Sequence, residues 1–274
     1  MNIAIIGCGY IGMEAAALWS KKGHHVTATT RHAERLADLA KVAQKTLILK
    51  NGDEEELALL IETNDVLVVT IAADSVDQYE NTYLHMAQQF RHLALQMELP
   101  RHLLYTSSSS VYGDHNGRWV DESGPLLAES EQGKVLIAAE NLYLSLSELD
   151  WKVCILRLAE IYGPGREISQ RVKNLQGHVL PGSGDQYTNM VHKADIVGAL
   201  DYSLRHQLEG VYNVVDDEHP SRRELYEQVI KEYSLSSFTW DSSLVGMHPG
   251  NKRVSNHKIK AAGYSFIHPS REIA

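Results

Sequence analysis

A glycine-rich turn near residue 7 constrains the fold of this chain more than any other feature. The motif Gly7-Cys8-Gly9-Tyr10-Ile11-Gly12 follows the apolar run Ile3 to Ile6 and opens a segment with helical periodicity. In this context the first glycine permits a tight turn, the second lets the backbone approach a pyrophosphate, and the third lets the helix pack closely on the strand. The N-terminus of such a helix directs N–H groups at the phosphates. We therefore predict a dinucleotide site at Gly7, Gly9, Tyr10, Ile11 and Gly12, with a purely structural turn as the alternative.

Short apolar runs alternate with longer segments of helical periodicity up to Arg157. This alternation predicts parallel strands joined by crossover helices, and hence an α/β fold with a Rossmann-type, doubly wound parallel sheet. The predicted strands are 3–6, 25–30, 46–49, 65–71, 102–106 and 152–157. The predicted helices are 11–22, 32–42, 53–62, 79–97 and 130–149.

The pattern changes after Arg157, where proline and glycine become frequent. A strand at 210–215 and helices at 221–233 and 255–262 are predicted there. We expect two domains, a dinucleotide-binding domain of residues 1–160, to which 190–215 returns, and a small C-terminal substrate lobe of residues 161–189 and 216–274. The loops at 163–184 and 241–251 are expected to decide the substrate, because open parallel sheets bind ligands beyond the carboxyl ends of their strands.

The charge balance and the cysteines exclude several classes of protein. The chain has 26 basic and 35 acidic residues, a formal net charge of −9, and so offers no basic face for nucleic acid or for an anionic membrane. Cys8 and Cys154 lie in separate apolar runs, which predicts neither a disulfide framework nor a paired-ligand metal site. No secretion signal is evident, and no apolar run approaches the roughly 18 residues of a membrane span. A cytoplasmic protein is predicted.

The end of the second predicted strand indicates which dinucleotide is bound. An acidic residue about 20 residues after the glycines would hold the ribose hydroxyls of NAD, but the segment here is Thr29-Thr30-Arg31. Arg31, and Arg35 one turn further on, offer charge-assisted hydrogen bonds to a 2′-phosphate instead. NADP(H) is therefore predicted in preference to NAD. The alternative is that both arginines belong to a solvated helix start.

Two later motifs carry a family resemblance. Strand 102–106 runs into Ser107-Ser108-Ser109-Ser110-Val111-Tyr112-Gly113, and strand 152–157 leads to Tyr162-Gly163-Pro164-Gly165. With these motifs in this order, the chain resembles the extended short-chain dehydrogenase/reductases, the family of NAD-dependent epimerases and dehydratases, over nearly its whole length. Further matches are Ala72-Ala73, Asn189 to Asp195 and Asn251 to Ser255. The resemblance implies that Ala72, Ala73 and Ser107 contact the dinucleotide.

The resemblance also implies a catalytic role for Ser108. A hydroxyl at the carboxyl end of a strand, beside the nicotinamide, can donate a hydrogen bond to the reacting oxygen of the substrate as charge develops on it. The alternative is that the run of serines forms a turn whose hydroxyls satisfy nearby backbone groups.

The chain departs from the family pattern at the catalytic residues. The family places a tyrosine and, four residues later, a lysine on the helix after the serine loop, with a glutamate four residues beyond the lysine. With Glu140 in the glutamate position, Gln132 and Leu136 occupy the tyrosine and lysine positions. Lys134 lies two residues from Gln132 and should face away from this site. Thr188 stands where the family has an arginine that binds a diphosphate. The chain therefore resembles the atypical branch of the family, which lacks the Tyr-x-x-x-Lys pair.

Another residue would then have to act as the acid or base. Glu160, at the end of the sixth predicted strand, is a candidate proton acceptor or substrate hydrogen-bond partner. Tyr112 and Tyr162 are more typical of packing residues, and His192 titrates in a suitable range but matches a structural position of the family. The fourteen histidines show no H-x-x-x-H or H-E-x-x-H grouping, so no metal is expected.

The retained and the lost residues support two hypotheses of function. The first is an NADP-dependent reductase or epimerase that uses Ser108 and a non-standard acid on a small carbonyl or carbohydrate-like substrate. The second is a non-catalytic protein that senses NADP(H), since the glycine turn is intact while the Tyr-Lys pair is lost. The expected partners are the dinucleotide and a small molecule. A monomer or a homodimer is expected, because the apolar residues of helices 79–97 and 130–149 suit either an interface or the core.

Overall fold

The computed structural model of this protein describes residues 1–97, 101–244 and 250–273. The chain divides into two units, and it passes between them several times. The first unit comprises Met1–Ser107, Ser130–Arg157 and Ala199–Val211, and the second comprises Ser108–Glu129, Leu158–Gly198 and Tyr212–Ala274. The expected division into a dinucleotide-binding domain and a substrate lobe is a functional one and stays a prediction.

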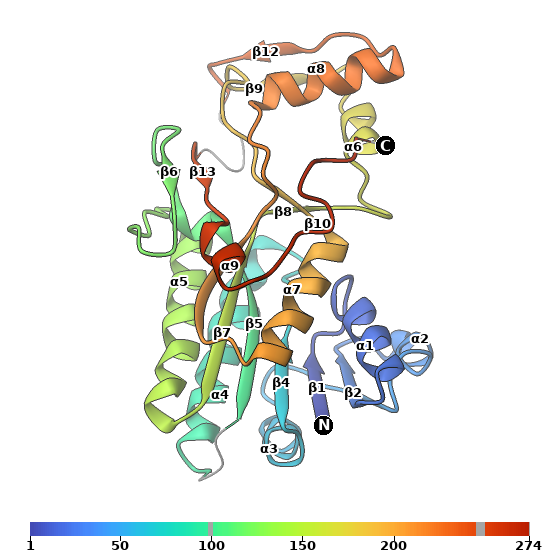
Figure 1. Cartoon of the computed structure of the whole chain (residues 1–274), viewed down its shortest axis with the longest axis vertical. Helices are drawn as coiled ribbons and strands as arrows, with labels where there is room; N and C mark the ends of the chain where they lie inside the picture. Colours follow the sequence, from blue (N-terminus) through green and yellow to red (C-terminus); the bar gives the residue numbers. More distant parts are fainter. Residues whose placement is uncertain (98–100, 245–249, 274) are drawn as a thin grey trace. The chain divides into compact units, whose positions relative to one another are not determined.

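A seven-stranded sheet dominates the structure. Its strands are β1 (Asn2–Ile6), β2 (His25–Thr30), β3 (Lys45–Ile48), β4 (Val66–Val69), β5 (His102–Ser108), β7 (Lys152–Leu158) and β11 (Gly210–Val214). Their order is β11-β7-β5-β4-β1-β2-β3, which is the order of a doubly wound Rossmann sheet. Figure 1 labels the strands from β7 to β2 in this order. Strand β1 is parallel to both of its neighbours, β2 and β4. The predicted fold class is confirmed.

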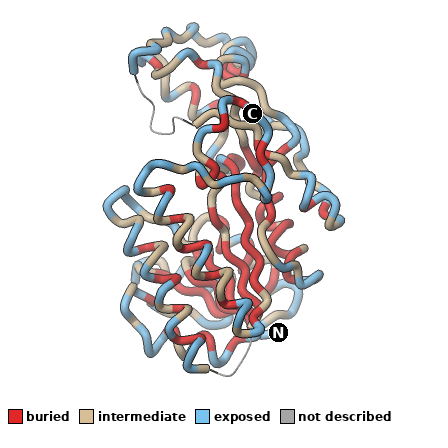
Figure 2. The backbone as a smooth tube through the Cα atoms, turned by 90° about the vertical axis from the view of Figure 1, so that its left-hand side faces the viewer, coloured by how far each residue is buried: buried red, intermediate tan, exposed pale blue. Residues whose placement is uncertain are grey.

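Helices cover the sheet of the first unit on both faces. Side chains alternate along a strand, so Ala4 and Ile6 of β1 pack in one apolar cluster with residues of α3 (Glu54–Thr63), α4 (His85–Ala94) and α5 (Glu131–Leu144). On the other face, Ile5 lies against α1 (Gly12–Lys21), where its Cγ2 is 3.1 Å from the position of a Cβ on Gly12. Figure 2 shows the strands as the most deeply buried part of the chain. Strands that are buried on both faces need the continuous apolar runs found in the sequence.

Three predicted helices are shorter or less regular than expected. The predicted helix 32–42 is a 3₁₀ turn, Ala33–Arg35, followed by the short α2 (Leu36–Leu39), in which Leu39 alone is buried. The predicted helix 79–97 begins as a π-helix, Glu80–Leu84, before α4, and the predicted helix 130–149 ends as a 3₁₀ helix, Ser145–Leu149, after α5. A single apolar anchor in α2 explains why that segment does not extend further.

The second unit contains short elements joined by long loops. These are β6 (Trp119–Val120), β8 (Glu160–Tyr162), α6 (Ile168–Asn174), β9 (Val179–Pro181), β10 (Met190–His192), α8 (Arg222–Tyr233), β12 (Thr239–Asp241), β13 (Arg253–Val254) and α9 (His257–Ala261). Strands β8 and β10, β9 and β12, and β6 and β13 form three separate parallel pairs. Helix α8 begins with a capping box between Ser221 and Glu224.

Helix α7 (Lys193–His206) was not predicted, because buried polar residues interrupt its apolar pattern. Asp195, Asp201 and Ser203 are all buried. Within the described ranges, every helix is too short or too polar to cross a membrane.

The segment after α9 is attached to the second unit through two buried carboxylates. Asp195 accepts hydrogen bonds from the Tyr264 hydroxyl at 3.1 Å and from the N–H groups of Ile267 at 2.6 Å and His268 at 2.9 Å. The Arg271 guanidinium forms a fully buried ion pair with Asp216, with 2.8 Å between Nε and Oδ2. Buried charges need such partners, so residues 264–271 are a structural part of this unit.

The charge state of Asp201 makes the stability of the first unit depend on pH. Burial alone would raise the pKa of this carboxyl, but hydrogen bonds from Lys22 at 2.6 Å and Arg205 at 2.9 Å outweigh it, so the pKa is lowered. A carboxyl with a lowered pKa in the folded state stabilises above the unfolded value of about 3.9 and loses this effect as the pH falls through the folded value. We expect Asp201→Asn to reduce the free energy of unfolding at pH 7 by about 1–2 kcal/mol.

Urea unfolding at pH 7 and below pH 4 tests this expectation. The difference between the unmodified chain and Asp201→Asn should shrink at the lower pH. Asp77→Asn, a change at an exposed position, is the control and should leave the acid dependence as it is. A difference for Asp201→Asn that stays constant with pH would contradict the role given to the Asp201 carboxylate.

Candidate functional site

The glycine turn joins β1 to α1, and the three glycines have different surroundings. Gly7 has a φ of +81°, and a Cβ there would lie 2.7 Å from Cγ2 and 2.8 Å from Cα of Ile71. A Cβ on Gly12 would lie 2.9 Å from the Thr70 Oγ1, so this glycine lets the helix pack on the sheet. A Cβ on Gly9 would meet only the Gly7 carbonyl oxygen, at 3.8 Å. Among the described residues, the space beside the Gly9 Cα is therefore open where a side chain would lie, although the Gly9 N–H itself donates to the Gly7 carbonyl at 2.7 Å.

The turn is held by the ends of the two neighbouring strands. The Gly7 N–H donates to the Thr29 Oγ1 at 3.2 Å, and the Cys8 N–H donates to the Thr29 carbonyl at 2.8 Å. From the other side, the Thr70 hydroxyl donates to the Gly7 carbonyl at 3.0 Å. Burial raises the pKa of the Cys8 thiol to about 12, so Cys8 is a neutral packing residue.

These features fit a bound pyrophosphate. Among the described residues, no side chain caps the N-terminus of α1, as is also true of α3, α4 and α6, whereas Ser130 caps α5 and Ser221 caps α8. Amides at an uncapped helix N-terminus, beside a backbone without a Cβ, are the donors that a pyrophosphate needs. The strand order reverses between β1 and β4, which is where doubly wound sheets bind ligands.

The two predicted arginines follow β2. The Arg31 Nη2 donates to the Ala72 carbonyl and to the Asp74 Oδ2, both at 3.0 Å. Arg35 is half-buried, and its positive charge acts to lower the pKa of the Cys8 thiol, against the larger effect of burial. Ala73 is fixed by its N–H, which donates to the Tyr83 hydroxyl at 3.3 Å. Asp74, which sequence analysis did not single out, follows the Ala72-Ala73 pair directly.

Ser107 belongs to a buried network of the first unit. Its hydroxyl donates to the Glu140 Oε1 at 2.6 Å. The same carboxylate accepts from the Arg157 Nε at 3.1 Å and from the Arg157 Nη2 at 2.7 Å. The hydrogen of the Ser107 hydroxyl is thus committed to Glu140, while its oxygen can still accept a hydrogen bond.

In the second unit, Ser108 and Tyr112 both have structural partners. The Ser108 Oγ accepts from the Ser110 N–H at 3.1 Å and caps the 3₁₀ helix Ser109–Tyr112. This is the backbone role that was the alternative for Ser108, although its hydroxyl hydrogen can still donate. The Tyr112 hydroxyl donates to the buried Asn213 Oδ1 at 2.8 Å, as expected of a packing residue.

Glu160 is exposed but already has a partner. It forms an ion pair with Arg171 of α6, and the Arg171 Nη2 also donates to the Ile161 carbonyl at 3.3 Å. Sequence analysis missed Arg171 because the contact joins two elements, β8 and α6, whose packing no local pattern indicates.

Helix α5 carries Gln132 and Leu136, which the sequence resemblance assigns to the family's tyrosine and lysine positions. Leu136 is buried and Gln132 is half-buried. Lys134 is exposed and its Nζ donates to the Glu131 Oε1 at 2.7 Å, so it has a surface role. A lysine that sequence analysis missed is Lys252, whose Nζ donates to the Gly113 carbonyl at 3.0 Å. Burial lowers the pKa of Lys252.

His192, His268 and Glu272 come together in the second unit, but they do not form a suitable metal site. The centroids of the two imidazole rings are 3.8 Å apart. Two imidazoles on one tetrahedral zinc, at about 2.1 Å, would have centroids roughly 5 Å apart. Burial and the neighbouring His268 lower the pKa of His192, so this ring stays neutral. Tyr162 packs on His192 with 5.2 Å between ring centroids.

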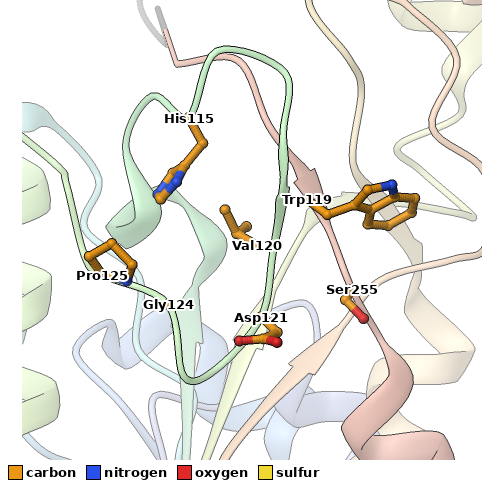
Figure 3. A pocket seen from close by; sticks show the side chains of 7 residues that line it. All are labelled: His115, Trp119, Val120, Asp121, Gly124, Pro125 and Ser255. Carbon is orange, nitrogen blue, oxygen red and sulfur yellow. The ribbon is translucent and has the colours of Figure 1, made fainter.

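A small hollow lies within the second unit, away from the predicted residues in sequence. Its volume is about 260 Å³. Figure 3 shows the lining side chains, which come from the loop around β6 and from the end of β13: His115, Trp119, Val120, Asp121, Gly124, Pro125 and Ser255. None of the predicted site residues lines this hollow.

Comparison with known proteins decides the family. The model of the NAD dependent epimerase/dehydratase family matches residues 3–215. The chain belongs to this family. One relative of this epimerase/dehydratase family member is protein YeeZ of Escherichia coli K12. The two sequences are 32% identical over 249 residues, which cover 89% of this chain and 88% of YeeZ.

Solved structures share the epimerase/dehydratase fold. The dTDP-glucose 4,6-dehydratase of Bacillus anthracis, in complex with NAD, has a TM-score of 0.80 and 21% identity, and covers 98% of this chain and 92% of its own. Human epimerase family protein SDR39U1, with NADPH, has a TM-score of 0.77 and 16% identity, and covers 98% of this chain and 96% of its own. The resemblance in fold thus extends over nearly the whole chain.

Proposed function

We propose that this family member binds NADP(H) in preference to NAD(H). The observation that carries the proposal is the glycine turn, open at the Cβ position of Gly9, with Arg31 and Arg35 close to it. Arg31 follows β2 and contacts the loop after β4, while Arg35 acts on Cys8 inside the turn. Guanidinium groups bind phosphate through charge-assisted hydrogen bonds. The proposed dinucleotide contacts are Gly7, Gly9, Tyr10, Ile11, Gly12, Arg31, Arg35, Ala72, Ala73 and Ser107.

We further propose a reductase or epimerase reaction on a small carbonyl or carbohydrate-like substrate. A bound nicotinamide supplies hydride transfer. The Ser108 hydroxyl, which accepts from the Ser110 N–H, would donate its hydrogen to the reacting oxygen of the substrate. Glu160 is the proposed proton acceptor, and the Arg171 ion pair would have to open or shift for it to accept a proton. The loops proposed to select the substrate are 163–184 and 241–251, of which 245–249 lie outside the described residues.

Calorimetric titration with NADPH and, separately, NADH tests the proposed cofactor site. NADPH is expected to bind at least tenfold more tightly than NADH. Arg31→Asp should remove most of this preference, because it replaces the donor with a carboxylate that suits ribose hydroxyls. Lys41→Asp makes the same charge change at an exposed position and is the control. Absence of binding by either nucleotide would overturn the proposed function.

A second candidate function is a non-catalytic NADP(H) sensor. The observations in its favour are that Leu136, which the sequence resemblance assigns to the position of the family's lysine, is buried, and that Ser107 and Ser108 both have structural hydrogen bonds. Loss of NADPH absorbance at 340 nm with a panel of carbonyl compounds and sugar nucleotides separates the two candidates. Turnover that Ser108→Ala abolishes would favour the enzyme, whereas binding without turnover on any substrate would favour the sensor.

We propose that the protein works in the cytoplasm as a monomer or a homodimer. Cys8 and Cys154 are both free and buried, which suits a reducing compartment. Light scattering of the purified chain measures the oligomeric state directly.

A further inference from the structure

The arginine proposed to bind the 2′-phosphate already has an anionic partner. The Arg31 Nη2 lies 3.0 Å from the Asp74 Oδ2, and the side chains are 31% and 60% exposed. The same nitrogen donates to the Ala72 carbonyl. The His32 Nε2 lies 4.0 Å from the same Asp74 oxygen, so an imidazole nitrogen also lies near this carboxylate. Asp74 therefore holds Arg31 by a direct ion pair.

The position of this ion pair connects it to the glycine turn. Arg31 follows β2 and Asp74 follows β4, and these two strands are the parallel neighbours of β1. Parallel strands bring their carboxyl ends to the same edge of a sheet. The ion pair and the turn after β1 thus lie at one edge of the first unit.

NADP(H) and NAD(H) differ in how each would interact with the Arg31–Asp74 ion pair. A 2′-phosphate carries about two negative charges and binds through guanidinium donors, so it must compete with the Asp74 carboxylate for Arg31. A 2′-hydroxyl carries no charge and needs no donor from Arg31. In many Rossmann folds a carboxylate after the second strand accepts the hydrogen bond of the 2′-hydroxyl, but here that position holds Arg31 and the nearby carboxylate comes from another loop.

We propose that Asp74 is a specificity-determining residue, which limits the preference for NADP(H) by holding the Arg31 guanidinium. This inference rests on the proposed function, because it concerns the strength of a preference that Arg31 supplies. The substitution Asp74→Asn removes the negative charge but keeps the shape of the side chain, and so it releases Arg31 to bind the phosphate. Binding of the unphosphorylated dinucleotide is not affected by this release.

Calorimetric titration of Asp74→Asn with NADPH and NADH, at low ionic strength, tests the proposal. Low ionic strength is chosen because salt screens exposed charge pairs. The ratio of the NADH to the NADPH dissociation constant should rise about tenfold, which corresponds to about 1.4 kcal/mol. The matched control is Asp77→Asn, which removes the same charge from an exposed position three residues further along and should leave the ratio unchanged. An unchanged ratio in Asp74→Asn, or an equal rise in both variants, would overturn the proposal.

A double-mutant cycle tests whether Asp74 acts through Arg31. In an Arg31→Ala background, Asp74→Asn should change the ratio by less than about twofold, since the guanidinium that it releases is absent. A full tenfold rise in that background would show that Asp74 acts without Arg31 and would overturn the proposal. If neither nucleotide binds to any variant, the proposed function and this inference both fall. If both bind and the ratio does not respond to Asp74→Asn, only the inference falls.

Discussion

Replacement of Glu140 by alanine is expected to lower the free energy of unfolding by about 3–5 kcal/mol. The Glu140 and Arg157 side chains are 1% and 5% exposed, with 2.7 Å between the Glu140 Oε2 and the Arg157 Nη2. The substitution leaves the guanidinium buried without this carboxylate, and it also removes the acceptor of the Ser107 hydroxyl. Urea unfolding followed by circular dichroism measures the loss.

Two further variants separate charge burial from packing. In the double variant Glu140→Leu, Arg157→Met, neither charge of this pair remains, so most of the stability should return. Glu148→Ala removes the carboxylate of an exposed pair with Arg91, at 3.6 Å, and should change the free energy of unfolding by less than about 1 kcal/mol. A loss for Glu140→Ala no larger than the loss for Glu148→Ala would contradict the structural role of the Glu140–Arg157 pair.

Replacement of Gly113 by alanine is expected to destabilise the second unit by about 3 kcal/mol or more. Gly113 has φ of 68° and ψ of −140° at the end of the 3₁₀ helix that Ser108 caps. An added Cβ would lie 2.2 Å from the Leu127 carbonyl oxygen and 2.7 Å from the Ala128 N. Both contacts are with backbone, which cannot move aside as a flexible side chain can. Thermal unfolding of the variant measures the effect.

Gly165→Ala is the matched control for this prediction. Gly165 also has a positive φ, +79°, but no atom lies within 4 Å of an added Cβ. Gly165→Ala should lower the free energy of unfolding only by the strain of the left-handed backbone, about 1 kcal/mol. Equal losses at the two positions would mean that the contact with Leu127 contributes nothing, contrary to the structure.

Local patterns were sufficient to predict most of the sheet and the glycine turn. The strand predicted at 25–30 has those bounds, and the strand predicted at 152–157 extends by one residue to Leu158. The strand at 152–158 is almost wholly buried, so its apolar run is nearly continuous, whereas the strand at 25–30 was recognisable from its β-branched valine and threonines. Gly7 and Gly12 were predictable for a similar reason, because their steric roles depend on a strand and a helix that are adjacent in sequence.

The partners of the candidate site residues were not predictable in this way. Arg31 meets Asp74 across 43 positions, and Ser107 meets Glu140 across 33. Arg271 donates to the hydroxyl and the carbonyl of Thr188, which the sequence resemblance aligns with the family's phosphate-binding arginine. Each contact depends on how loops and helices fold over the strand ends, and no periodicity in the sequence encodes that arrangement.

The attachment of residues 264–271 has a consequence for the order in which the chain can fold during synthesis. Asp195 and Asp216 leave the ribosome well before Tyr264, Ile267, His268 and Arg271, their partners in the folded state. Until those partners emerge, burial of either carboxylate is unfavourable. Full packing of the neighbouring elements β10, α7 and β11 therefore has to await partners that are made 55 to 73 residues after the two carboxylates. Slow translation between β11 and residue 271 would prolong this exposed state, and it is at this stage that a nascent chain would most need protection from aggregation.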